Sequence, residues 1–380
     1  MKNKISIILY MLLLFPFLYS GSLFNDSLLL VKIWKIGAAI ILTFLTFKDY
    51  KRIKINKITF IIIIFALYQF INSLLNSTLS SGIFFTIYFM AISILFLQRE
   101  LYEDNFNFLF ALCIIHNILL VLNIPSLISQ INVDEYNRQF FLGGKNALCM
   151  FTVPTIFYNY LYYNLTKKKM TISCIFIIIL AIITPMIGGS STGTVVSILM
   201  MLFIMIGEKI RFNPIIMYIV YIIILIVILN PLIISNIGFL NNLITDILNK
   251  DLTFTGRTEI WDVTTNLIVH NLFGYGRGNT VLSSYLLHVD EAHNIFLQLL
   301  LDGGIVSLVV FVYYFLTCVF TKNRNKFNYK IINITQITIF SLFLIGLTES
   351  MTYKLDLWII MLILYFFKTK NKELKNEKEH

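Results

Sequence analysis

Charge is scarce in this chain. Lys, Arg, Asp and Glu make up 13% of its 380 residues, whereas soluble proteins carry roughly a quarter. Hydrophobic residues make up 58%, more than a soluble core could bury. The composition therefore excludes a soluble enzyme and predicts an integral membrane protein.

Cysteine is also rare. The four cysteines, Cys113, Cys149, Cys174 and Cys318, are scattered through apolar runs, a spacing typical of neither a disulfide framework nor a metal site. The run Asp290–His293 spells a helicase box, but the glycine-rich phosphate loop that such enzymes need is missing from the sequence. We therefore expect no metal, no cofactor and no nucleic-acid partner.

What the chain has is a succession of apolar runs. A bilayer is crossed by ~20 residues, and backbone groups in lipid must be satisfied within the segment, so these runs are predicted to be helices. The fold class is therefore all-α, with residues 1–380 forming a single polytopic membrane domain. About twelve spans are predicted, near residues 5–20, 27–47, 58–75, 81–97, 106–122, 146–163, 171–187, 192–206, 214–234, 295–320, 331–347 and 353–367.

Basic residues predict the orientation of these spans. They gather in every second loop and in the charged tail 368–380, and loops rich in Lys and Arg stay in the cytoplasm. We therefore expect both termini to be cytoplasmic, and we attribute the formal net charge of +10 to topology. The basic loop residues are Lys48, Lys51, Arg52, Lys54, Lys57, Lys167, Lys168, Lys169, Lys209, Arg211, Lys322, Arg324, Lys326 and Lys330. The segments 123–145, 188–193, 235–294 and 348–352 are then outside.

The large outer loop, residues 235–294, is predicted to contain an amphipathic helix. Apolar residues recur there at helical spacing: Ile260, Trp261, Thr264, Leu267, Ile268 and Leu272. Charged and polar residues fall mostly elsewhere around the axis: Glu259, Asp262, Asn266 and His270. We expect this helix to lie along the membrane surface, to begin at Thr255 or Gly256 and to end in the turn Gly274–Gly278.

Two groups of motifs carry a resemblance to a known family. The later group comprises Gly256-Arg257, Trp261, Gly274-Tyr275-Gly276, His293-Asn294 with Leu297, and Gly303-Gly304. The earlier group comprises Arg138, Gly143, Gly144 and Asn146-Ala147. With these motifs, residues 136–310 resemble the core of the O-antigen polymerase and O-antigen ligase superfamily, and the span layout is also similar.

The resemblance implies metal-independent glycosyl transfer from an undecaprenyl diphosphate carrier. Negative charge then grows on the departing diphosphate, where an arginine fork is well suited to bind it. We assign this role to Arg257 and Arg138, with Arg277 and Lys145 as further candidates. Alternatively, Arg257 and Arg277 anchor the loop to anionic headgroups or pair with Glu259 and Asp262.

The resemblance also implies that His293 is the general base. An imidazole exchanges protons near neutral pH and could take the proton of the acceptor hydroxyl. Glu259 and Glu291 are alternative bases, and His293 could instead only cap the following span. Trp261 and Tyr275 could stack on sugar rings or belong to an interfacial aromatic belt.

Lys32 and Lys35 are cations placed within an apolar run. Since a charge in lipid is expensive, they either extend to the headgroups or face a polar cavity that holds the carrier diphosphate. The run Gly188–Gly193 departs from the family pattern, because many relatives carry a basic element there.

The leading functional hypothesis is a polymerase at the outer face of the bacterial cytoplasmic membrane. It would join undecaprenyl-diphosphate-linked oligosaccharide repeats into a capsular or O-antigen polysaccharide, with a flippase and a chain-length regulator as pathway partners. A ligase that moves finished polymer to another acceptor is the alternative within the family. A flippase or transporter is the alternative of another class, but such proteins usually show internal repeats and midplane charges, of which this sequence has little.

Overall fold

The computed structural model describes residues 2–18, 29–48, 56–103, 105–133, 138–166, 170–207, 209–229, 256–287, 289–323 and 329–369. Residues 235–255 of the predicted outer loop, with Thr255, and residues 370–380 of the charged tail lie outside this set. Some of the basic loop residues also lie outside it: Lys51, Arg52, Lys54, Lys167, Lys168, Lys169, Arg324 and Lys326.

The described chain is almost entirely helical. The helices are α1 (Lys2–Leu18), α2 (Leu29–Phe47), α3 (Lys57–Leu75), α4 (Ser81–Tyr102), α5 (Asn107–Leu122), α6 (Ile124–Ser129), α7 (Leu148–Thr166), α8 (Ile172–Gly188), α9 (Ser191–Gly207), α10 (Pro214–Ile228), α13 (Arg257–His270), α14 (Ile295–Phe320), α15 (Tyr329–Gly346) and α16 (Leu355–Thr369). Two 3-10 turns, η4 (Lys145–Ala147) and η6 (Leu282–Ser284), and a small antiparallel pair, β1 (Gln139–Phe140) with β2 (Gly143–Gly144), complete it.

A helix lies at each predicted membrane span, so the helical prediction is confirmed. The protein is a multi-pass membrane protein. Within the described ranges, six segments are long and apolar enough to cross a membrane: Leu29–Phe47, Lys57–Leu75, Ser81–Tyr102, Asn107–Ser129, Ile295–Phe320 and Tyr329–Gly346. Shorter apolar helices are Ser6–Leu18, Ile172–Gly188, Ser191–Gly207 and Pro214–Ile228. The number of crossings and the cytoplasmic position of the termini stay predictions.

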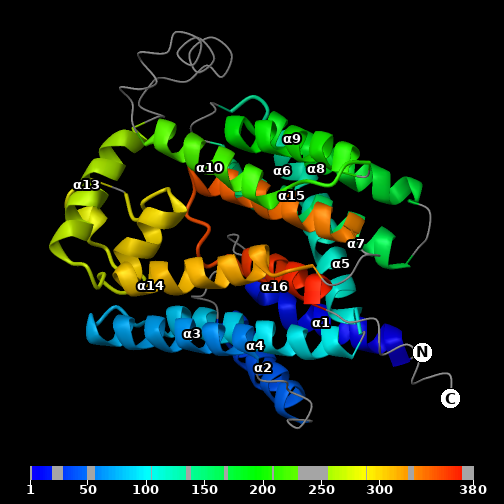
Figure 1. The fold of residues 1–380 in the computed structure, drawn as a ribbon, viewed down its shortest axis with the longest axis horizontal. Coiled ribbons are helices and arrows are strands. Elements are labelled where there is room, and N and C mark those ends of the chain that lie inside the picture. Colours follow the sequence, from blue (N-terminus) through cyan, green and yellow to red (C-terminus); the bar gives the residue numbers. More distant parts are fainter. Residues whose placement is uncertain are drawn as a thin grey trace.

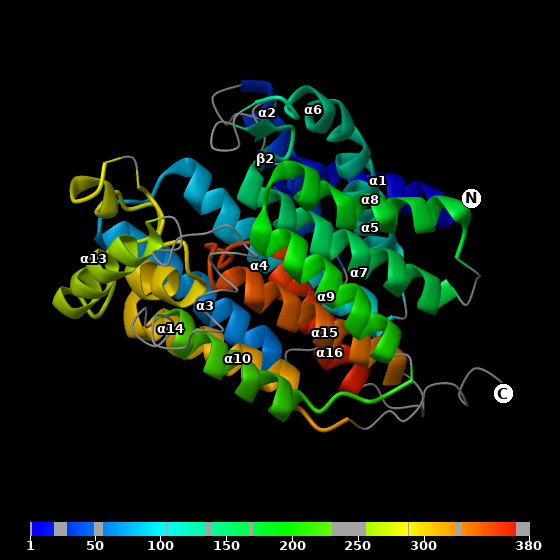
Figure 2. The ribbon, with the colours of Figure 1, turned by 90° about the horizontal axis from the view of Figure 1, so that it is seen from above.

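The predicted outer loop contacts the ends of two predicted spans at one end of the helix bundle. The amide of Arg277 donates to Ser73 Oγ over 3.0 Å, and Asn294 Nδ2 donates to the carbonyl of Leu347 over 3.1 Å. Helix α13 lies at this end, beside the first turns of α14, in both views (Figures 1 and 2). The bundle therefore has one end that collects the residues of the candidate site.

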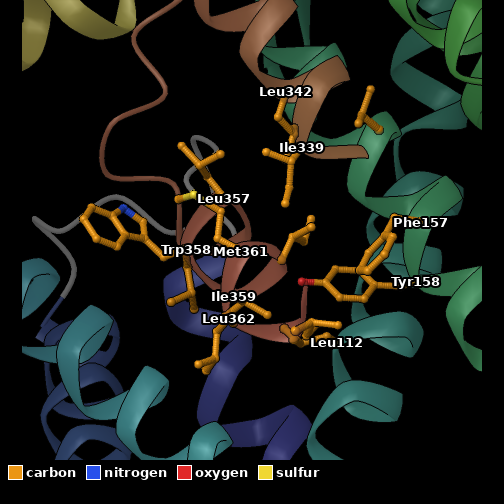
Figure 3. Packing of buried hydrophobic residues seen from close by; sticks show 14 of the residues in the cluster. Leu112, Phe157, Tyr158, Ile339, Leu342, Leu357, Trp358, Ile359, Met361 and Leu362 are labelled. Carbon is orange, nitrogen blue, oxygen red and sulfur yellow. The ribbon is translucent and has the colours of Figure 1, made fainter. Parts of the chain in front are cut away.

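Helix α16 lies in the centre of the bundle. Its Leu357, Trp358 and Met361 are fully buried among side chains from α5, α7 and α15 (Figure 3). The indole of Trp358 also packs on Phe65 of α3, with ring centroids 4.6 Å apart, and its Nε1 donates to the carbonyl of Thr352. The loop before α16 is therefore tied to a rigid core, which fixes the residues that this loop carries.

Helix α14 is broken at Gly303 and Gly304, which have non-helical dihedral angles. The apolar turn Leu272–Gly276 occupies the break and satisfies the freed backbone groups. The amide of Tyr275 donates to the carbonyl of Leu301 over 2.8 Å, and the amide of Ile305 donates to the carbonyl of Leu272 over 2.9 Å. Two glycine motifs that are far apart in the sequence thus form one contact, in which the backbones approach too closely for side chains.

We expect Gly304→Ala to destabilise the protein by roughly 3 kcal/mol. Gly304 has a φ of +61°, and a Cβ there would overlap the backbone of Leu272 and Phe273. Thermal unfolding in detergent measures the effect. Gly37→Ala in α2 is the matched control, because no atom lies within 4 Å of its Cβ position. Equal unfolding midpoints for the two variants would contradict this account of the break.

The predicted amphipathic helix is confirmed as α13, with Gly256 as its N-cap. Its buried residues are Trp261, Thr264, Leu267 and Ile268, all on the predicted apolar face. Leu267 packs with Leu301 of α14 and with Leu282 and Ala292. Part of the apolar face therefore packs on protein, whereas Leu272 is 50% exposed, and the position of this helix along the membrane surface stays a prediction.

Candidate functional site

Three charged or titratable side chains meet at the end of the bundle where α13 lies. Arg257, the first residue of α13, forms an ion pair through Nη2 with Oε1 of Glu349. The second oxygen of that carboxylate, Oε2, lies 3.7 Å from Nδ1 of His293. Glu349 is almost fully buried, whereas about a third (35%) of the His293 side chain is exposed. One carboxylate thus holds an arginine and faces an imidazole that is open to an incoming molecule.

His293 has an unusual backbone that its neighbours hold in place. Its φ is +48°, a conformation that a non-glycine residue rarely adopts. The preceding residue, Ala292, donates its amide to Gln298 Oε1 over 2.8 Å and accepts from Trp261 Nε1 over 3.1 Å. The following residue, Asn294, caps α14 through its side chain. Because both neighbours are fixed, the imidazole has a defined position next to Glu349.

A cavity of about 620 Å³ lies near this cluster, although Arg257, His293 and Glu349 are not among its lining residues. Ser350 and Glu291, which are neighbours of Glu349 and His293 in sequence, are among its lining residues. Its apolar wall comes from α1, α4 and α7: Pro16, Phe17, Leu18, Phe89, Met90, Met150 and Phe151. We call this space the outer cavity. Its mixed wall suits a ligand with a polar head and an apolar chain.

Three cations line the outer cavity: Lys35, Arg277 and Lys354. The guanidinium of Arg277 stacks on Tyr353, with Cζ 3.6 Å from the ring centroid. Its Nη1 is buried and has no hydrogen-bond partner. Burial lowers the pKa of Arg277, against the opposite effect of nearby carboxylates. A buried guanidinium donor without a partner favours an anionic ligand.

Carboxylates also line the outer cavity: Asp290, Glu291, Asp302 and Asp356. Two of them are engaged within the protein. Asp302 Oδ1 accepts from Gln298 Nε2 over 2.9 Å and from Asn279 Nδ2 over 3.1 Å. Asp356 Oδ1 accepts from Tyr158 over 2.8 Å and lies 3.1 Å from His116 Nε2. These bonds leave the ammonium and guanidinium groups as the better ligands for a negatively charged molecule.

Arg138, the other arginine predicted to act on the diphosphate, has a different environment. Its three nitrogens donate to the backbone carbonyls of Val133, Ile187 and Ile131 over 3.0, 3.1 and 3.1 Å. The guanidinium thus joins the segment 123–145 to the end of α8. The structure therefore brings Arg257 together with Glu349 and His293, but it engages Arg138 with backbone groups instead.

Some of the remaining predicted residues line the outer cavity, and the others are exposed or pack within the protein. Arg277 and Lys35 line the outer cavity, whereas Lys32 is exposed on α2 and Glu259 is exposed on α13. Lys145 is half-buried in η4. The aromatic candidates pack inside the protein. Trp261 is 4% exposed and bonds to Ala292, and the half-buried Tyr275 donates its hydroxyl to the carbonyl of Leu267 over 3.0 Å.

The sequence analysis missed four residues of this site: Glu349, Lys354, Gln298 and Asp302. A signal existed for the first two, because charged side chains in the short segment 348–352 and at the start of the last predicted span are unusual in so apolar a chain. Gln298 and Asp302 lie one and two helical turns after Asn294, on the same face of α14. Only the packing of α13 and α16 on that face shows what they contact.

The comparison with known families agrees with this geometry. Residues 176–312 match the model of the O-antigen ligase family. The matched region runs from α8 into α14 and contains Arg257, Arg277 and His293. No curated protein matches the sequence. Over this region, the chain is similar to the O-antigen ligase family.

Proposed function

We propose that the protein is a polysaccharide polymerase that joins oligosaccharide repeats carried on undecaprenyl diphosphate. The growing chain is the donor, and the nonreducing end of an incoming repeat is the acceptor. Transfer takes place at the outer face of the bacterial cytoplasmic membrane. A ligase that uses the same donor with a different acceptor is the second candidate, favoured by the description of the matching family.

The reaction replaces one bond to the anomeric carbon by another. The acceptor hydroxyl oxygen attacks that carbon, the bond to the diphosphate oxygen breaks, and the hydroxyl proton passes to a base. The developing charge on the diphosphate requires fixed cations. Arg257, held by Glu349 next to the lining residue Ser350, is our candidate for this task, and Lys35, Arg277 and Lys354 supply charge within the outer cavity.

We assign the base role to His293. Its imidazole is partly exposed, and Oε2 of Glu349 lies 3.7 Å from Nδ1. A carboxylate beside one ring nitrogen stabilises the imidazolium that forms when the other nitrogen takes a proton. Glu291 lines the outer cavity and stays the alternative base, whereas Glu259 is exposed on α13.

One observation carries the proposal. Arg257 begins α13, and His293 lies just before α14. Both side chains lie against the carboxylate of Glu349, near a cavity that three cations line. This arrangement provides a group for the leaving diphosphate and a group for the acceptor proton within one site.

Purified protein supplied with lipid-linked repeats tests the proposed function. Glycans released from the carrier are separated on a gel. We expect a ladder of increasing length. Transfer to a non-carrier acceptor without a ladder would instead establish a ligase, and unchanged repeats with both acceptors present would contradict both enzymes and favour a transporter.

Gln298 is expected to act as a positioning residue. Gln298→Met keeps the size of the side chain but removes the bonds to Ala292, Asp302 and Ser350. We expect kcat to fall about 50-fold, since an ångström of misplacement at a reacting group has effects of this order. KM for the donor should change less than kcat, because Gln298 bonds to Ala292, the residue before His293. A rise in KM with kcat unchanged would contradict this role.

A further inference from the structure

A second cavity lies at the opposite end of the bundle, where α3 begins and α14 and α16 end. Its volume is about 540 Å³. The residues that line it are Lys57, Tyr313, Leu316, Thr317, Phe320, Thr321, Lys322, Tyr365 and Thr369. We call it the basal cavity. It shares no lining residue with the outer cavity, so the proposed glycosyl transfer does not account for it.

The charge of the basal cavity has one sign. Among the described residues that line it, two are lysines and none is acidic, in contrast to the four carboxylates of the outer cavity. Lys57 Nζ lies 4.6 Å from the ring centroid of Tyr313, which holds the ammonium over the cavity wall. A third lysine, Lys368, precedes the lining Thr369 and is buried, with its ammonium bonded to the carbonyl of Val319. The cavity is therefore a region of positive potential that attracts anions.

The rest of the lining is typical of an amphiphile site. The hydroxyl groups of Thr321 and Thr369 donate to carbonyls of their own helices, so the two lysines are the main donors for phosphate oxygens. Tyr313, Leu316 and Phe320 are 45%, 45% and 40% exposed. These apolar faces belong to an apolar helix long enough to span a membrane, so they adjoin acyl chains rather than water. A phosphate group at the lysines would thus have a path for attached hydrocarbon along α14.

We propose that the basal cavity binds a phosphate group, and that its source is the headgroup of an anionic phospholipid in the adjacent leaflet. The predicted topology makes this the cytoplasmic leaflet, where basic residues and anionic headgroups attract each other. The proposal does not depend on the proposed glycosyl transfer.

Native mass spectrometry of the detergent-purified full chain tests the site. Phosphatidylglycerol and phosphatidylcholine with identical acyl chains are titrated separately, and inorganic phosphate is added in a third arm. Wild type should retain one phosphatidylglycerol in preference to phosphatidylcholine. Lys57→Gln with Lys322→Gln should weaken that retention roughly 30-fold, since each lysine near an anionic headgroup contributes to binding.

The matched control is Lys209→Gln with Lys330→Gln, which removes two exposed lysines elsewhere in the predicted cytoplasmic loops and should leave retention unchanged. Lys57→Arg with Lys322→Arg should also retain the lipid. Displacement of phosphatidylglycerol by inorganic phosphate alone would identify a soluble phosphate compound as the ligand and overturn the lipid source. Equal retention of both lipids, or undiminished binding in the double glutamine variant with an unchanged unfolding midpoint, would overturn the site.

Discussion

Arg257→Ala is expected to lower kcat about 1,000-fold, because removing one preorganised donor from a developing oxyanion has an effect of this order. Arg257→Lys should recover only part of the loss, since an ammonium lacks the planar fork. Rates of single transfers from purified, lipid-linked donor measure both variants. Arg211→Ala, at an exposed arginine between α9 and α10, is the matched control and should behave as wild type.

The ion pair between Arg257 and Glu349 predicts a second result in the same experiment. If Glu349 acts by holding Arg257, then Glu349→Gln should reduce the rate in wild type but add little in the Arg257→Ala background. Residues that act as a unit show such non-additive effects. Multiplicative losses in the double variant would mean that Glu349 works independently of Arg257, for example through His293 alone.

Arg277→Ala is expected to raise the donor KM about 100-fold while kcat changes much less. The guanidinium lines the outer cavity and keeps a buried Nη1 without a partner, so an anionic ligand would gain a charge-assisted hydrogen bond there. Steady-state kinetics with varied donor separate KM from kcat. Arg277→Lys should lie between wild type and the alanine variant.

A structural loss must be distinguished from a binding loss at this position. The backbone amide of Arg277 bonds to Ser73 Oγ, a contact that the alanine variant keeps, so the loop should stay in place. The unfolding midpoint should therefore change little. An unchanged donor KM in a folded Arg277→Ala variant would remove Arg277 from the donor site.

Much of the helical scaffold is predictable because it depends on local patterns. Long apolar runs must form helices in lipid, and the structure has a helix at each predicted span. The α13 pattern was equally clear, since Trp261, Thr264, Leu267 and Ile268 occupy one face. What the pattern does not contain is the partner of that face, because an apolar stripe packs equally well on a membrane or on α14.

The candidate site was predictable only in part, for reasons of distance along the chain. Arg257 and His293 belong to recognisable motifs, but Glu349 lies 92 residues after Arg257 and has no motif around it. Arg138 belongs to a motif too, yet its bonds to three carbonyls depend on the positions of the neighbouring loop and of α8. A sequence motif identifies an arginine without showing which acceptors surround it.

Buried charges in the spans were also underestimated from the sequence. His116 and Asp356 lie in separate helices, and each alone is an isolated polar residue in an apolar run. In the structure Asp356 contacts both His116 and Tyr158. Asp356 also lines the outer cavity. The presence of titratable residues within the spans is therefore a weaker criterion for telling a transporter from a transferase than the sequence suggested.

The central claim is that the outer cavity and the Arg257–Glu349–His293 cluster form one donor site. Photo-crosslinking tests it most directly, with an undecaprenyl diphosphate donor that carries a photoreactive group in the isoprene unit next to the diphosphate. Peptide mapping should find the label on residues of the outer cavity wall, such as Phe17, Phe89 or Phe151, and competition by unlabelled donor should remove it. Labelling confined to the outward faces of α8 to α10 would contradict the claim.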